Sequence, residues 1–334
     1  EQQPGPVNWA KYNPVPQAGA VRMWSWEAVA HGAELVSYFR WRQAPFAQEQ
    51  MHAGLMLRNN EPATGLAEAK QFASELGLLG GAETSQSAIA LIHDYEADWI
   101  SELDGQSADF AYLPLMLDFY RAIRRQGGSV DIIGPYDDIS GYALVIIPCL
   151  MHVPDSLANQ IENFDGQLLI GPRTGAKTID FQLPENLAPG PLASATGVKI
   201  TRVDALPASQ KIQVSGDELS GNFNIWRELA MAQGTVLATG DDGYPALIKS
   251  NRTSYLAGWP DAKLADNIIG KAMQNADIVT HEMPSYLRVR QRGNKLIFVN
   301  YGGETATIPD SFSGIFILGT KDVPAAGVSI MQID

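Results

Sequence analysis

Tyr142-Ala-Leu-Val-Ile-Ile147 is a continuous apolar run, and it decides the fold class of the middle of this 334-residue chain. Such a run is typical of a strand covered on both faces, which is the environment of a central parallel strand. Further strands are expected around it at residues 88–93, 130–133, 168–170, 198–203, 234–239 and 246–249. Helical patterns alternate with these strands at residues 112–125, 154–163 and 263–275. The block is therefore predicted to be a doubly wound α/β domain.

The sequence on either side of this block has a different pattern. After residue 285 only strands and turns are expected, at residues 286–290, 296–300, 315–318 and 327–331, which predicts a small all-β domain. Before residue 80, helices are expected at residues 21–31 and 62–79, with a buried strand at residues 34–39. The predicted domains are residues 1–80, 81–284 and 285–334.

The composition argues against several kinds of partner. Lys and Arg total 24 and Asp and Glu total 37, so the formal net charge is −13. A net-acidic chain without a basic run is a poor ligand for phosphate backbones or anionic lipid, so neither nucleic acid nor membrane is expected as a partner. No stretch approaches the ~18 apolar residues of a membrane-spanning helix. The single cysteine excludes a disulfide framework and favours a cytoplasmic location.

Two motifs with known chemistry are incomplete. Residues 171–178 resemble a phosphate-binding loop, but Ala176 stands where that pattern requires glycine before the lysine. Cys149 follows the apolar run, where an α/β nucleophile would lie, yet Pro148 and Leu150 flank it instead of the glycines of a strained elbow. A buried, inert thiol is expected there. The five histidines lack metal-ligand spacing, so neither a metal nor a cofactor is expected.

Aromatic residues are concentrated at the start of the chain. Four of the seven tryptophans lie in the first 41 residues, and they can form either an aromatic core or a ring-stacking pocket for a sugar. Trp9 favours the pocket, because its Pro- and Gly-rich surroundings exclude a helix or a central strand. Glu49 and His52 would share one face if their segment were helical, and a solvated loop is the alternative.

Three stretches carry a resemblance to a known family. Residues 1–9 (EQQPGPVNW), 24–32 (WSWEAVAHG) and 37–54 (SYFRWRQAPFAQEQMHAG) strongly resemble the family-42 glycoside hydrolases, the β-galactosidases. The resemblance implies a (β/α)8 barrel with the active site, a class I glutamine amidotransferase-like α/β domain that makes a homotrimer, and a small C-terminal β domain. Residues 1–80 would then be a C-terminal remnant of the barrel, its last helix–strand–helix, with the six preceding strands absent.

The same resemblance implies roles for individual residues. Glu1 opens the Glu-Gln-Gln-Pro-Gly motif and corresponds to the catalytic nucleophile. Trp9, Phe39, Glu49 and His52 correspond to residues that line the galactose subsite. The implied chemistry is coherent, because a retaining glycosidase uses one carboxylate as nucleophile and a second carboxyl group, about 5–5.5 Å away, as acid/base.

No residue of this chain suits the acid/base role. In the family that glutamate follows an asparagine, but Asn60-Glu61 directly precedes Pro62 at the start of the last barrel helix and is rejected. One hypothesis is a retaining β-galactosidase that hydrolyses terminal β-D-galactosides by double displacement, with this chain supplying the nucleophile and part of the subsite. The alternative is a catalytically silent oligomerisation fragment of such an enzyme, and a sugar-binding protein is a weaker third. The chain alone is predicted to be inactive.

Overall fold

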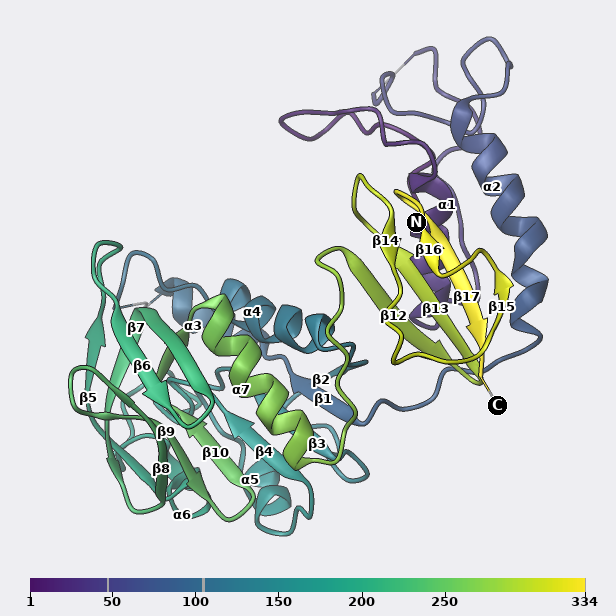
Figure 1. Cartoon of the computed structure of the whole chain (residues 1–334). Coiled ribbons are helices and arrows are strands. Elements are labelled where there is room, and N and C mark those ends of the chain that lie inside the picture. The colour runs from purple at the N-terminus through teal and green to yellow at the C-terminus, as the bar shows by residue number, and fades with distance from the viewer. Residues whose placement is uncertain (47, 104–105, 334) are drawn as a thin grey trace. The chain divides into compact units, whose positions relative to one another are not determined.

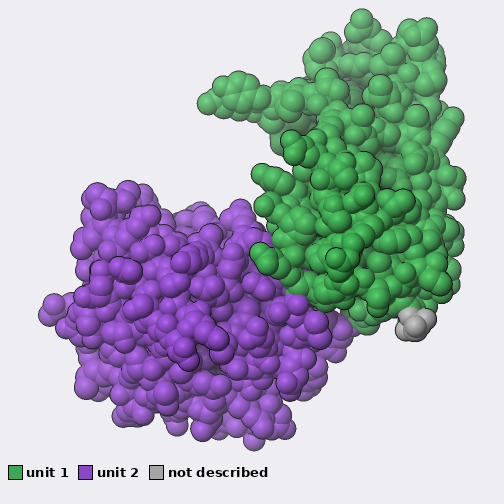
Figure 2. Space-filling view, viewed as in Figure 1, with its two compact units in different colours: residues 1–85, 281–334 green, residues 86–280 purple. Residues whose placement is uncertain are grey.

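The structure, a computed structural model, describes residues 1–46, 48–103 and 106–333, which divide into two compact units (Figures 1 and 2). Unit 1 combines residues 1–85 with residues 281–334, and unit 2 holds residues 86–280. The first and last parts of the chain therefore fold together. Every helix within the described residues falls short of the length and apolarity needed to cross a membrane.

Unit 2 is built on a mixed sheet of eleven strands. One half is parallel and consists of β2 (Asp131–Ile133), β1 (Ile89–Ile92), β3 (Leu144–Ile147), β4 (Gln167–Ile170) and β10 (Thr253–Leu256). The other half is antiparallel and consists of β9 (Pro245–Ser250), β8 (Thr235–Gly240), β6 (Ile212–Gly216), β7 (Leu219–Ala232), β11 (Gly258–Pro260) and β5 (Val198–Ala205), which pairs with β7. The predicted α/β class is confirmed, with the apolar run as a central strand.

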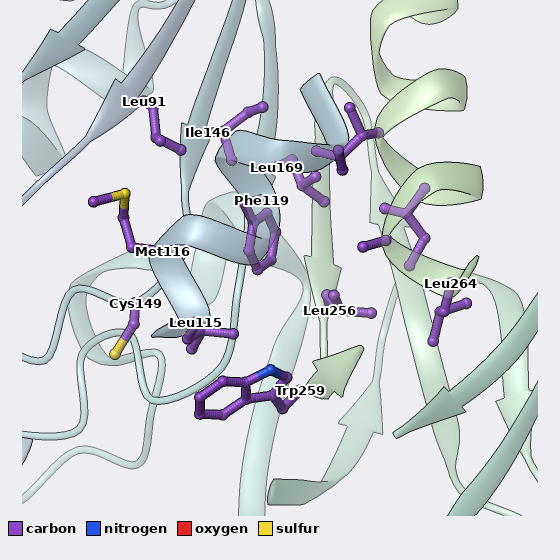
Figure 3. Packing of buried hydrophobic residues seen from close by; sticks show 14 of the residues in the cluster. Leu91, Leu115, Met116, Phe119, Ile146, Cys149, Leu169, Leu256, Trp259 and Leu264 are labelled. Carbon is purple, nitrogen blue, oxygen red and sulfur yellow. The ribbon is translucent and has the colours of Figure 1, made fainter. Parts of the chain in front are cut away.

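Helices cover both faces of the parallel half, which explains why β3 is apolar throughout. Leu144 and Ile146 share a core with α3 (Tyr95–Leu103), α4 (Tyr112–Arg125) and α7 (Ala262–Asn275). Figure 3 shows Phe119 of α4 in this core together with Ile146, Leu169 and Leu264. Val145 and Ile147 point to the opposite face, where α5 (Asp155–Glu162), η2 (Gly190–Leu192) and α6 (Ala193–Thr196) lie.

Unit 1 combines two helices with a four-stranded antiparallel sheet. The helices are α1 (Ala20–Ala30) and α2 (Thr64–Glu75), and the 3-10 turn η1 (Leu76–Leu79) follows α2. The sheet has the order β12 (Leu287–Arg292), β13 (Lys295–Asn300), β17 (Val328–Gln332) and β15 (Ile315–Leu318). A separate two-stranded ladder joins β14 (Ala306–Thr307) to β16 (Asp322–Val323).

The core of unit 1 is shared between the two parts of the chain. Trp26 of α1 is fully buried in a cluster with Phe72 of α2 and with four residues of the C-terminal sheet: Ile297, Val299, Val328 and Ile330. The rings of Trp26 and Phe72 meet edge to face, with centroids 5.5 Å apart. Glu75 of α2 accepts hydrogen bonds from Arg22 Nε at 2.7 Å and from Trp26 Nε1 at 3.0 Å.

The strand expected at residues 34–39 does not form. Its only trace is a single parallel bridge between Tyr38 and Gln2, in which Gln2 N donates to Ser37 O at 2.7 Å and Phe39 N donates to Gln2 O at 3.1 Å. The next donor of such a ladder would be the backbone nitrogen of residue 4. Pro4 has no N–H, so the pairing cannot continue in this direction.

Candidate functional site

The N-terminal motif and the loop after Phe39 are held together in unit 1 by backbone contacts. The bridge described above places Gln2 beside Tyr38. Ala53 N donates to Pro6 O at 3.0 Å, and a Cβ on Gly5 would lie only 2.7 Å from that of Ala53. Glycine is required at position 5 because any side chain would separate the motif from the loop that carries His52.

His52 is the most buried member of the predicted site. Its ring is 1% exposed and packs edge to face on Phe39, with ring centroids 5.2 Å apart. Its Nε2 lies 2.7 Å from Oε1 of Gln3. With a carbonyl oxygen opposite, Nε2 is the donor, so Nδ1 of the neutral ring is an acceptor. Among the residues that the structure describes, nothing hydrogen-bonds to this Nδ1.

Arg40 links the aromatic ring to the carboxylate of the site. Its Nη2 donates to Oε2 of Glu49 at 2.7 Å, and its guanidinium carbon lies 4.4 Å from the centroid of the Phe39 ring. The Nε of Arg40 is buried and has no partner within the described part of the chain. One oxygen of the exposed Glu49 carboxylate is thus fixed by an ion pair. The other has no hydrogen bond from a described residue and can accept one from a ligand.

The segment that carries Glu49 and His52 is a turn rather than a helix. His52 N donates to Glu49 O at 3.0 Å, and Glu49 has a φ of 57°. The two side chains differ in environment, because Glu49 is exposed and His52 is buried. A left-handed backbone is uncommon at a non-glycine residue and is found often where a site imposes geometry.

Two of the five predicted site residues stay apart from this cluster. Glu1 is exposed, and its hydrogen bond is a long one of 3.5 Å from Gln3 Nε2. Trp9 is 69% exposed and, among the described residues, stacks on no other ring. Its predicted loop is confirmed, since no helix or strand includes it. Ring contacts and an ion pair bring Phe39, Glu49 and His52 together through Arg40, whereas among the described residues no hydrogen bond, ion pair or ring contact joins Glu1 or Trp9 to them.

Two residues that hold the cluster together were not among the predicted site residues. Gln3 is part of the opening motif, and Arg40 directly follows Phe39, so both lie within the sequence stretches that point to the family.

A small hollow beside the cluster is lined by Pro6, Val7, Asn8, Asn13, Gln50 and Met51. Asn8 adds a third buried polar atom, its Oδ1, for which the described residues supply no partner.

The end of β3 in unit 2 offers no competing active site. Cys149 is 1% exposed, and burial raises the pKa of its thiol to about 12. Figure 3 shows its side chain in the core with Leu115 and Met116 of α4. The neighbouring Glu228 is also fully buried and accepts hydrogen bonds from Arg173 N, Trp226 Nε1 and Tyr255 Oη. The expected buried thiol is confirmed.

The described residues contain no group of three or more His, Cys, Asp or Glu that could hold a metal.

Carboxylates close to aromatic rings on loops are typical of the active sites of glycoside hydrolases. A family model described as "Beta-galactosidase" matches residues 1–79, and one described as "Beta-galactosidase trimerisation domain" matches residues 87–279. The chain belongs to the family-42 β-galactosidases.

Named relatives agree with this assignment. A β-galactosidase of Thermus thermophilus is 44% identical over 99% of this chain, and one of Haloferax lucentense is 34% identical over 99%. The crystal structure of a β-galactosidase from the psychrophilic Marinomonas ef1 is 40% identical and superimposes with a TM-score of 0.97 over the whole chain. The chain spans about half of these relatives, 52% of each.

Proposed function

We propose that this chain carries the C-terminal portion of a retaining β-galactosidase that hydrolyses terminal β-D-galactosides by double displacement. Residues 1–80 would close the catalytic barrel, residues 81–284 would form a homotrimer, and residues 285–334 would be the small β domain. The proposal includes a cytoplasmic location, which rests on cysteine usage alone. The observation that carries the catalytic proposal is the cluster of Phe39, His52 and Glu49, with buried polar atoms left without partners beside it.

The cluster has the donors and acceptors that a hexose needs. His52 Nδ1 is free to accept a hydroxyl hydrogen bond because Gln3 occupies Nε2. Glu49 keeps one carboxylate oxygen for a hydroxyl because Arg40 occupies the other. Buried polar atoms without partners cost stability, and a sugar hydroxyl would satisfy them. Phe39 supplies an apolar wall, and Trp9, which is exposed, can stack on the sugar.

Glu1 is the proposed nucleophile. Its carboxylate would attack the anomeric carbon, the bond to the leaving oxygen would break, and a covalent glycosyl-enzyme would form. Water would then hydrolyse this intermediate with retention of configuration. A second carboxyl group must protonate the leaving oxygen of an ordinary galactoside. We propose that this chain does not supply that group, and it is therefore expected to leave a nitrophenyl β-galactoside intact.

A substrate that needs no general acid tests the nucleophile on this chain alone. Dinitrophenyl 2-deoxy-2-fluoro-β-galactoside has a leaving group that departs unprotonated, and its fluorine slows hydrolysis of the intermediate. Incubation is expected to add one fluorogalactosyl group to the peptide that begins at Glu1, measured by mass spectrometry. Glu1→Gln should abolish the label, and Glu34→Gln, which changes another glutamate of unit 1, should retain it. Label on another residue, or none, would contradict the role of Glu1.

The alternative function is a catalytically silent oligomerisation fragment. It is favoured by the contrast between the eleven-stranded sheet of unit 2 and the irregular loops that hold the candidate site. A chain that takes up no label and binds no galactose by calorimetry, but is a trimer by light scattering, would have this function instead.

A further inference from the structure

Helix α3 has one face packed in unit 2 and one face that the described residues leave exposed. Ala97 and Ile100 are buried, and the helix contacts α4 on that side. Tyr95, Trp99 and Leu103 recur every four residues, so they form a stripe on the outer face. They are 67%, 54% and 76% exposed. Large exposed side chains gathered on one helix face mark a surface that contacts another molecule.

Carboxylates flank this aromatic stripe on both sides. Glu96 lies beside Trp99, while Asp98 and Glu102 lie along the opposite side, and the helix contains no basic residue. None of the three carboxylates forms an ion pair within the described residues. The complementary surface must therefore offer apolar side chains together with Lys or Arg.

A surface of that kind exists on the antiparallel half of unit 2. β5 pairs with the C-terminal part of β7, and the register places Lys199 opposite Met231 and Arg202 opposite Leu229. Lys199, Arg202 and Met231 are exposed, and Leu229 is half-buried. Neither cation pairs with a carboxylate among the described residues. Two cations thus stand beside two apolar side chains. One carboxylate, Asp204, lies further along β5.

We infer that the α3 stripe of one copy of this chain docks on the β5–β7 surface of a second copy. The inference rests on the proposed trimer and names the surfaces that build it. Residues 86–280 hold 13 basic and 24 acidic residues, so copies repel one another unless a specific contact offsets the repulsion. Cations facing the carboxylates of α3 provide that contact and also select its register.

The two surfaces lie on different elements, so the contact is heterologous. α3 packs beside α4 on the parallel half, whereas β5 belongs to the antiparallel half (Figure 1). An open assembly built by such a contact has an unused α3 stripe at one end and an unused β5–β7 surface at the other, until these two meet and close a ring. A ring of three copies uses every stripe and every β5–β7 surface. Tyr and Trp at the centre with charges at the rim is the usual anatomy of a stable interface.

Light scattering after gel filtration of the full chain tests the inference. The unaltered chain is expected at three times the mass of one chain, which is 36.2 kDa. Two double variants are expected to have one third of this trimer mass and an unchanged far-UV circular dichroism spectrum. One alters the stripe, Trp99→Ser with Leu103→Ser, and the other alters the β5–β7 surface, Lys199→Glu with Arg202→Glu. All four side chains are exposed, so folding does not depend on them.

A charge exchange gives the sharpest result. The double variant Asp98→Lys with Glu102→Lys should also yield single chains. A fourfold variant that combines these two changes with Lys199→Glu and Arg202→Glu should be a trimer again, because each contact then pairs opposite charges. Leu183→Ser and Lys211→Glu are matched controls on exposed residues outside both surfaces and should remain trimeric. Trimers that survive the stripe and β5 changes would overturn this inference and leave the proposed trimer intact. A single-chain mass for the unaltered protein would overturn the proposed trimer itself.

Discussion

The guanidinium of Arg227 donates two hydrogen bonds to the carboxylate of Asp242, from Nε to Oδ2 at 2.9 Å and from Nη2 to Oδ1 at 3.0 Å. The arginine is 1% exposed. Its remaining donors reach four backbone carbonyl oxygens, those of Glu228, Pro245, Ala257 and Tyr244. One buried cation therefore ties β7 to the turn after β8 and to the start of β9.

Removing the acid of this pair is expected to destabilise unit 2. Asp242→Ala leaves a buried guanidinium without its counter-ion, so the free energy of unfolding should fall by about 3 kcal/mol, the lower end of the range for broken buried pairs. The retained carbonyl contacts keep the loss from being larger. Hydrogen exchange of β7 peptides in increasing urea measures this change in the free energy of unfolding. Asp217→Ala, at an exposed aspartate, should change the value by less than about 0.5 kcal/mol.

Glu228 is expected to make the stability of the chain fall as the pH rises, whereas a carboxylate in an exposed ion pair makes stability rise with pH. Burial raises the pKa of this carboxyl above its usual 4.5, although Tyr255, Arg173 and Trp226 donate to it. A group whose pKa is raised on folding stabilises the protein fully below its unfolded pKa, and this contribution is lost as the pH rises through the folded pKa.

Glu228→Gln removes this titration and keeps an acceptor in place. The stability of the unaltered chain relative to the variant should be highest below about pH 4.5 and should fall as the pH rises above it, because the folded protein then has to hold a charged carboxylate in a buried position. Urea midpoints of both proteins below and above that pH measure the difference. A constant difference would show that Glu228 has the same pKa in the folded and unfolded chain.

The parts of the fold that depend on local pattern could be predicted from the sequence, and those that depend on tertiary partners could not. The helix at residues 112–125 was predicted with its observed ends, because apolar periodicity, terminal arginines and two glycines agree. β7 was not predicted, because Asn222 and Asn224 interrupt its apolar residues. Arg227 and Glu228 within it look like surface residues in the sequence. Their partners are distant in the sequence: Asp242 comes from the turn after β8 and Tyr255 from β10, so only the fold shows that both residues are buried.

The candidate site shows the same division. The resemblance selected Phe39, Glu49 and His52, which the structure gathers into one cluster. The contacts that hold the cluster could not be predicted, because Gln3 and His52 meet across 49 positions of the chain and only the fold brings them together. The roles of all five residues, Glu1 and Trp9 included, stay predictions, because contacts between side chains do not by themselves test a role in catalysis or binding.

Cys149 is expected to be chemically silent in the folded chain. Its thiol is 1% exposed, and burial raises its pKa to about 12, so almost no thiolate exists at neutral pH. Ellman's reagent should therefore release no colour from the native protein within an hour and one equivalent after unfolding in guanidinium. Rapid release from the native protein would contradict the buried position and revive the cysteine as a candidate nucleophile.

The shared core of unit 1 predicts that distant segments unfold together. Trp26→Ala removes a fully buried ring that contacts Phe72 and donates to Glu75, so unit 1 should lose about 3–5 kcal/mol of stability. The core cluster of Trp26 includes β13 and β17 but no residue of unit 2. Hydrogen exchange should therefore accelerate together in residues 20–30, 295–300 and 328–332, and remain unchanged in β1 and β3. Trp41→Ala, at a tryptophan that is 65% exposed, is the matched control and should leave all of these segments protected. Protection retained in β13 and β17 while α1 exchanges freely would show that the C-terminal sheet is stable without the helix that covers it.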